Sequence, residues 1–175
     1  MATNVNTVIR KCYGIKVIEE YESSGVALIP GMVAELTSTA NRIQAHATSS
    51  GNAYPLIVFE DELQGVSVDT AYTATAGTKV QTWMPQRGDE ANLILVDGQS
   101  VVRGDRLESN GAGYLQKYVA DVDAAHDSDD ADPATTIYTT PILCIALEAM
   151  DLSGSSGEET SGNLGYNKRI AVKFV

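Results

Sequence analysis

The sequence predicts a mainly β protein: a small β-barrel or β-sandwich with an extended N-terminal arm and little helix. Small and β-branched residues dominate its 175 residues, and fifteen glycines separate short apolar stretches. Short strands at close spacing, joined by glycine turns, are typical of sandwiches and small barrels. No long segment places apolar residues at the i, i+3, i+4 and i+7 positions of an amphipathic helix.

The length of the chain fits one domain with an arm, since 175 residues can bury a substantial core. Residues 1–24 are expected to form the arm, because this segment is polar at first and then apolar enough to pair with another strand. Residues 25–175 are expected to form the barrel or sandwich domain.

Alternating or continuously apolar segments predict the strands of this domain. The strand-like segments are residues 13–19, 79–84, 91–96, 99–102, 139–150 and 168–175. Asp97-Gly98 is a strong tight-turn pair between two of them. The final segment alternates to its last residue and places Ile170, Val172 and Phe174 on one face. The best helix candidate is short and spans residues 114–125.

Two further segments are predicted to be loops. Residues 121–134 form an acidic loop with six aspartates, and residues 153–165 form a flexible hairpin tip rich in Gly and Ser. Calcium takes about six to eight oxygen ligands, which these aspartates could supply. An EF-hand is excluded, because His126 and Asp132 occupy the positions that require Gly and Glu. A solvated acidic loop is the preferred interpretation, and calcium binding is left open.

The acidic composition excludes several classes of partner. Lys and Arg number 12 against 23 Asp and Glu, so the net charge is −11, and the pI is about 4.4. Such a surface repels nucleic-acid phosphates and anionic lipid, so neither nucleic acid nor a membrane is expected as a partner. No apolar run approaches the roughly 18–20 residues of a membrane helix, and the N-terminal residues lack the pattern of a secretory signal.

Neither a metal site nor a disulfide is expected. Cys12 and Cys144 lie far apart in apolar-rich segments, and two buried thiols made in a reducing cytoplasm are favoured over a disulfide. Whether they meet in space is left open. The two histidines, His46 and His126, are isolated, whereas a zinc site needs more ligands at closer spacing. The sequence therefore predicts no metal and no cofactor.

Catalytic motifs are missing, so the chain is not expected to be an enzyme. It lacks both the Gly-x-Ser-x-Gly nucleophile motif and the GxxxxGK[ST] phosphate-binding loop. The carboxylates of residues 60–62 could serve a glycosidase, but the chain has one Trp and two Phe as sugar platforms, so a surface turn is preferred. Arg-Gly-Asp occurs at 87–89 and 103–105, where turns that open the next strands are favoured over integrin binding.

Short motifs in the middle and at the end of the chain carry a family resemblance. Residues 70–116 contain the phrase Gly104-Asp-Arg-Leu107, a polar turn, and then Gly113-Tyr-Leu115. Strand-like segments at Ile145–Ala149 and Arg169–Val172 follow. In these features the chain resembles the head decoration, or cement, proteins of tailed bacteriophages. The resemblance covers roughly residues 25–120 and the last pair of strands, whereas the acidic insertion and the long arm depart from shorter family members.

The resemblance implies a β-barrel or β-sandwich that binds the outside of an icosahedral shell, often as a trimer at threefold or quasi-threefold positions. It implies a structural protein that stabilises the capsid by clamping neighbouring major capsid proteins, with no catalytic residues. The expected partner is the major capsid protein, and a homo-oligomer is expected, with a trimer favoured. The expected location is the outer capsid surface of the virion, after synthesis in the host cytoplasm.

Five residues are candidates for capsid or subunit contact. An N-terminal arm can add a strand to the exposed sheet edge of a neighbour. Tyr13, Ile15, Val17 and Ile18 are the arm residues expected to make this contact. Trp83 is expected either in the core, which is favoured, or as an interface anchor.

The alternative function is a β-sandwich module that binds carbohydrate or another ligand in a phage fibre or a cell-surface assembly. Such a module would need an aromatic platform or a calcium site. Trp83, the tyrosines and the 121–134 loop are the candidates for these features.

Overall fold

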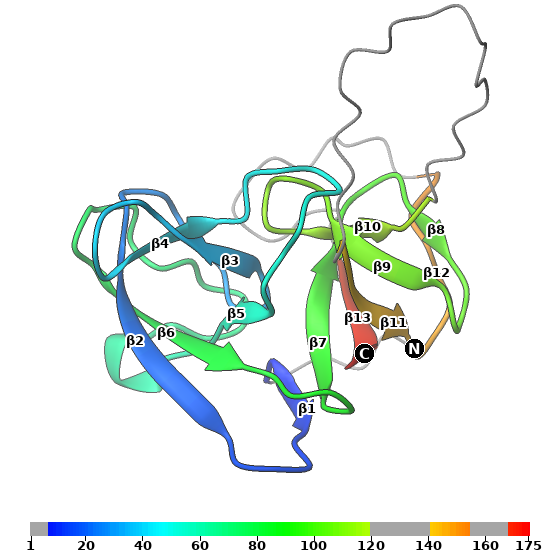
Figure 1. Ribbon diagram of the computed structural model, residues 1–175, viewed down its shortest axis with the longest axis horizontal. Helices are drawn as coiled ribbons and strands as arrows, with labels where there is room; N and C mark the ends of the chain where they lie inside the picture. Colours follow the sequence, from blue (N-terminus) through cyan, green and yellow to red (C-terminus); the bar gives the residue numbers. More distant parts are fainter. Residues whose placement is uncertain (1–6, 120–140, 155–167) are drawn as a thin grey trace, which may run out of the picture.

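Two small closed β-barrels, each of five strands, make up the fold. The computed structural model describes residues 7–119, 141–154 and 168–175, and Figure 1 shows the two barrels side by side. The predicted class, mainly β with little helix, is confirmed. Within the described ranges, helical structure is confined to one 3-10 turn, η1 (Glu62–Gln64).

The first barrel contains the strands from β2 to β6. In pairing order they are β2 (Val17–Ser23), β4 (Arg42–Ala45), β3 (Val33–Leu36), β5 (Leu56–Val58) and β6 (Lys79–Met84). β6 closes the barrel by pairing antiparallel with β2, from Val17↔Met84 to Glu22↔Lys79. The interior is filled by a cluster of buried side chains that includes Leu28, Ile43, Leu56, Tyr72 and Val80.

The second barrel is built around β7. In pairing order its strands are β7 (Glu90–Leu95), β10 (Leu115–Lys117), β9 (Arg106–Ser109), β11 (Ile142–Ala146) and β13 (Lys168–Phe174). β13 closes the barrel by pairing with β7 over its first six residues. β1 (Ile9–Lys11) pairs with the start of β7, and β8 (Ser100–Val101) and β12 (Met150–Asp151) form a separate two-stranded ribbon.

Local patterns account for several of these strands. β6 coincides with the predicted segment 79–84, and β13 begins at the predicted residue 168. Ile170, Val172 and Phe174 all enter the core, as their alternation predicts. The predicted Asp97-Gly98 turn joins β7 to β8, and Gly98 has φ +82°, a backbone conformation that disfavours a side chain.

One hydrophobic cluster fills the second barrel and extends to Trp83 on the first, whereas the interior of the first barrel forms a separate cluster. Trp83 on β6 packs edge to face against Phe174 on β13, with ring centroids 5.8 Å apart and ring planes at 89°. Trp83 has no exposed surface. Its interpretation as a core residue is confirmed, whereas a direct contact between Trp83 and a capsid or subunit surface is wrong, because no part of the side chain reaches solvent.

The structure corrects the expected arm over residues 1–24. Residues 17–23 form β2, an integral strand of the first barrel, and residues 9–11 form β1 on the second barrel. The backbone of both segments is therefore paired within the chain, β1 with β7 and β2 with β6. Residues 1–6 lie outside the described residues.

The expected helix at 114–125 is also wrong where the structure describes it. Leu115–Lys117 is strand β10, because Leu115 is buried and the segment pairs antiparallel with β9. Residues 120–125 and the acidic loop 121–134 lie outside the described residues. Of the predicted hairpin tip at 153–165, only Ser153 and Gly154 are described, and they form a turn after β12.

Two further observations concern the sequence predictions on membranes and thiols. Among the described residues no helix is both long and apolar enough to cross a membrane. Cys12 and Cys144 are both free, as expected. Cys144 is buried, and its burial raises the pKa of the thiol, whereas Cys12 is only partly buried.

Candidate functional site

The loop between β1 and β2 exposes two large apolar side chains. Tyr13 is 58% exposed and Ile15 is 79% exposed. Figure 1 places this loop at the lower end of the molecule, where the chain passes from one barrel to the other. Ile18, on the outside of β2, is 39% exposed, whereas Val17 is half-buried. The structure thus brings Tyr13, Ile15 and Ile18 to the surface; we call residues 12–18 the docking loop.

A buried carboxylate fixes the backbone of the docking loop. Asp89 is 1% exposed, and its Oδ1 accepts a 2.9 Å hydrogen bond from the Tyr13 backbone N–H. Its Oδ2 accepts another of 2.9 Å from the Gln86 N–H, and the Cys12 thiol lies 3.8 Å from the same oxygen. Asp89 belongs to the Arg87-Gly88-Asp89 tripeptide, whose role here is a turn that opens β7, as the sequence predicted. Such a preorganised loop loses little conformational entropy on binding.

Lysines surround the exposed ring of Tyr13. The Lys11 Nζ lies 4.4 Å from the ring centroid, and the Lys173 Nζ lies 5.6 Å from it. The Lys16 Nζ lies 4.2 Å from the ring of Phe59. The side-chain hydrogen bond with Tyr13, together with the charge of Glu90, raises the pKa of Lys11 above its ordinary value. Both ends of the docking loop therefore carry positive charge beside aromatic surface.

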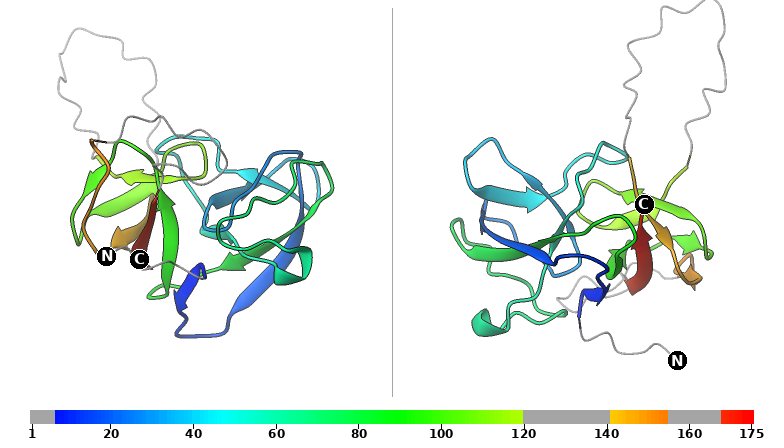
Figure 2. Two further views of the ribbon diagram at one scale, coloured as in Figure 1. Left: turned by 180° about the vertical axis from the view of Figure 1, so that it is seen from behind. Right: turned by 60° about the horizontal axis from the view of Figure 1, so that its bottom comes forward.

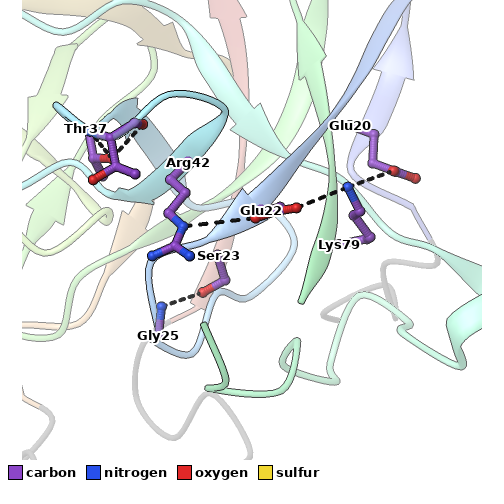
Figure 3. A network of polar contacts seen from close by, with 8 residues as sticks. Glu20, Glu22, Ser23, Gly25, Thr37, Arg42 and Lys79 are labelled. Carbon is purple, nitrogen blue, oxygen red and sulfur yellow. Dashed lines mark hydrogen bonds and ion pairs between the residues drawn. The ribbon is translucent and has the colours of Figure 1, made fainter. Parts of the chain in front are cut away.

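The outer face of the first barrel is different, because its cations are paired with carboxylates. Figure 3 shows Lys79 between Glu20 and Glu22, with Nζ–O distances of 3.7 and 3.3 Å. Arg42 approaches Glu22 from the other side, at 3.9 Å. Exposed pairs of this kind add little stability, but they neutralise charge locally. Lys11, Lys16 and Lys173 take part in none of the ion pairs found among the described residues.

A serine–histidine pair that the sequence did not indicate lies between the barrels. Ser109 on β9 and His46 after β4 are 2.9 Å apart, Oγ to Nδ1. The His46 Nε2 lies 3.0 Å from the Asn52 carbonyl and 3.8 Å from the Glu35 carboxylate. In the neutral imidazole, Nε2 donates to the carbonyl and Nδ1 accepts from the serine hydroxyl. Both side chains are buried, and their hydrogen bond joins the two barrels.

Other arrangements with catalytic or ligand-binding potential have structural explanations. Asp61, one of the carboxylates in residues 60–62, is buried and caps η1 by accepting the Leu63 and Gln64 N–H groups. The described part of the chain holds no cluster of three His, Cys, Asp or Glu side chains suited to a metal ion. A hollow of about 260 Å³ is lined by Ala53, Tyr54, Pro55, Ile142, Leu143 and Val175. Its lining has no charged side chain to orient a polar ligand.

Comparison with known proteins adds no relative. No protein-family model matches the chain, and no curated protein matches its sequence.

Proposed function

We propose that this chain is a non-enzymatic structural protein that decorates the outside of an icosahedral phage capsid. It stabilises the shell by clamping neighbouring major capsid proteins, through the docking loop. It acts as a homo-oligomer, with a trimer favoured, on the outer surface of the virion after synthesis in the host cytoplasm. The resemblance to head decoration proteins supports this assignment.

The structural observation that carries the proposal is the docking loop itself. Tyr13 and Ile15 are large, exposed and apolar, and Asp89 anchors the loop at the backbone N–H of Tyr13. Tyrosine is enriched among the residues that dominate binding energy at protein interfaces. Burial of each such side chain contributes about 1.5–3 kcal/mol. A rigid apolar contact of this kind suits a protein whose role is to hold another protein.

Binding to an assembled shell increases the overall affinity beyond that of one docking-loop contact. A decoration protein that binds only the assembled shell stabilises that state by mass action. An oligomer that engages several capsid subunits gains further affinity from effective concentration. Two fused barrels with an interior serine–histidine bond and a hydrophobic cluster that extends to Trp83 supply a stiff body for such a clamp.

Co-sedimentation with shells tests the proposal. The shells are empty particles assembled from a tailed-phage major capsid protein. We expect saturable binding at a fixed ratio to the capsid protein, and a loss of at least about tenfold in affinity for Tyr13→Ser/Ile15→Ser. The matched control is Val26→Ser/Leu36→Ser, two exposed apolar residues of the first barrel outside the docking loop.

These variants separate the loop from general surface effects. Equal binding by the Tyr13/Ile15 variant and the wild type would remove the docking loop from the interface. Failure of the wild type to bind any shell would remove the proposed function.

A ligand-binding module of a phage fibre or cell-surface assembly is the second candidate. The observation that favours it is the apolar hollow beside Tyr54. Binding on a glycan array that is lost in Tyr54→Ala would support it. Absence of any glycan or calcium effect on thermal stability would count against it.

A further inference from the structure

We propose that the major capsid protein presents carboxylates to a row of three cations on the outer face of the second barrel: Lys11, Lys173 and Arg106. This inference rests on the proposed function and specifies the chemistry of the partner at the contact. This row, which we call the basic row, adjoins the docking loop at Lys11 and Lys173, whose ammonium groups lie against the ring of Tyr13.

The strand register of the second barrel aligns these side chains. Lys11 on β1 is paired with Glu90 on β7, and Glu90 is paired with Lys173 on β13. Lys173 is paired in turn with Ile145 on β11, and Ile145 with Arg106 on β9. Directly paired residues project from the same face of a sheet, so the five side chains form one row. Adjacent strands lie about 4.8 Å apart, so successive cations of the row are about 10 Å apart at the backbone.

The basic row faces solvent. Lys11 and Arg106 are exposed, and Lys173 is half-buried beside the ring of Tyr13. Leu107, which follows Arg106, and Phe174, which follows Lys173, point to the opposite face of the sheet and are buried in the core. Figure 2 shows from two further directions that β1, β7 and β13 lie next to one another in the second barrel.

The positive charge of the row is not balanced within the described residues. Glu90 is the one carboxylate in the row, against three cations. The ion pairs of Arg and Lys found among the described residues use other cations, namely Arg42, Lys79, Lys117 and Arg169. A local excess of positive charge on a chain of net charge −11 is complementary to an anionic surface.

A protein surface fits this charge pattern better than a polyanion does. Duplex DNA and anionic bilayers carry dense charge over long distances, so they meet the repulsion of the whole acidic chain. When a single carboxylate-bearing segment of a partner protein binds at the row, it lies within a Debye length, about 8–10 Å, of the cations. Salt then screens it from most of the acidic groups elsewhere on this chain. Tyr13 and Ile15 beside the row also need an apolar counterpart, which a protein surface supplies.

Charge reversal at the two exposed ends of the row tests the inference. Lys11→Glu/Arg106→Glu changes the net charge by the same amount as its control, Arg103→Glu/Lys168→Glu, and all four residues are exposed. With the shells described above, we expect at least about tenfold weaker binding for the row variant and less than about twofold for the control. Wild-type affinity should fall as salt rises from about 50 to about 300 mM.

A second measurement needs no shell. Fluorescein-labelled hexaglutamate serves as the carboxylate probe at low salt, beside a short duplex DNA and phosphatidylserine vesicles. We expect the wild type and the control to bind hexaglutamate more tightly than either competitor, and the row variant to lose at least about tenfold in affinity. Light scattering of the free proteins accompanies the titration.

Each outcome decides between the two proposals. If the affinity for shells changes neither with salt nor in the Lys11→Glu/Arg106→Glu variant, the inference is overturned and the proposed function is unaffected. Absence of wild-type shell binding counts against the proposed function. The hexaglutamate titration then shows by itself whether the basic row binds carboxylates. Tighter binding of DNA or of vesicles overturns the assignment to a protein partner. If light scattering shows that the wild type forms an oligomer and the row variant does not, a second copy of the chain occupies the basic row. This result would also overturn the inference.

Discussion

Trp83 and Phe174 pack edge to face between the two barrels, with ring centroids 5.8 Å apart. Each lies on the strand that closes its barrel, β6 for Trp83 and β13 for Phe174. The same contact fixes the proposed docking surface, because Ile18 is the partner of Trp83 across the sheet and Lys173 directly precedes Phe174. The buried contact between Trp83 and Phe174 thus lies directly next to the surface residues Ile18 and Lys173, through strands β6 and β13.

The first prediction concerns this contact. Trp83→Ala will lower the free energy of unfolding by about 3–5 kcal/mol, because it removes a fully buried aromatic side chain and leaves a cavity. Equilibrium urea unfolding measures the change. Tyr54→Ala, which truncates an exposed aromatic residue, is the control and should stay within about 0.5 kcal/mol of the wild type. A loss below about 1 kcal/mol for Trp83→Ala would contradict the packing of Trp83 in the core.

The second prediction concerns the carboxylate under the docking loop. Asp89→Ala leaves the N–H groups of Tyr13 and Gln86 without their acceptor, and hydrogen bonds to a charged group contribute about 1.5–3 kcal/mol each. We therefore expect lower stability together with faster amide exchange at Tyr13. Hydrogen exchange followed by mass spectrometry measures the second effect. Asp151→Ala, at the exposed end of β12, should leave exchange of the docking loop unchanged.

The third prediction compares two glycines with similar backbone conformations. Gly31 has φ +91° and Gly98 has φ +82°, so alanine at either position carries backbone strain of about 1–2 kcal/mol. At Gly31 an added Cβ would also overlap the Arg169 Nη1 and would lie 3.1 Å from the Asn92 carbonyl oxygen, whereas at Gly98 it meets open space. Gly31→Ala should therefore be the more destabilising by thermal unfolding. Equal melting temperatures for the two variants would show that Arg169 does not occupy the position described.

The fourth prediction is a pH dependence. The Tyr21 hydroxyl donates a hydrogen bond to Glu19, which together with partial burial and the charge of Glu19 raises the pKa of Tyr21 to about 12. The folded protein thus holds the proton above the ordinary pKa of about 10, so Tyr21 contributes stability in full below pH 10. This contribution is lost as pH rises from about 10 to about 12.

Unfolding by urea at several alkaline pH values measures this effect. The difference in unfolding free energy between the wild type and Tyr21→Phe should shrink as the pH passes 10. A difference that stays constant up to pH 12 would rule out the link between Tyr21 and Glu19.

Much of the secondary structure could be predicted because its cause is local. The alternation in 168–175 and the turn at Asp97-Gly98 are properties of neighbouring residues, and β13 and the β7–β8 turn follow from them. The arm and the short helix were wrong for the opposite reason. β2 is a strand of the first barrel because it pairs with β6, about sixty positions along the chain, and β10 exists because it pairs with β9.

The candidate site divides in the same way. Tyr13, Ile15 and Ile18 stood out in the sequence as apolar residues near the N-terminus, and they are exposed. The basic row could not be predicted, because its members come from β1, β7, β13, β11 and β9 and meet only through the register of the barrel. Two similar barrels in one chain were equally beyond the sequence, since short β segments do not specify which strands pair.

Titration of the wild-type protein against purified empty shells, with bound protein quantified after sedimentation, tests the central claim most directly. We expect saturable binding at a fixed ratio to the major capsid protein, with affinity reduced at least about tenfold by Tyr13→Ser/Ile15→Ser. Protein that stays in the supernatant at every ratio and at low as well as high salt would contradict it.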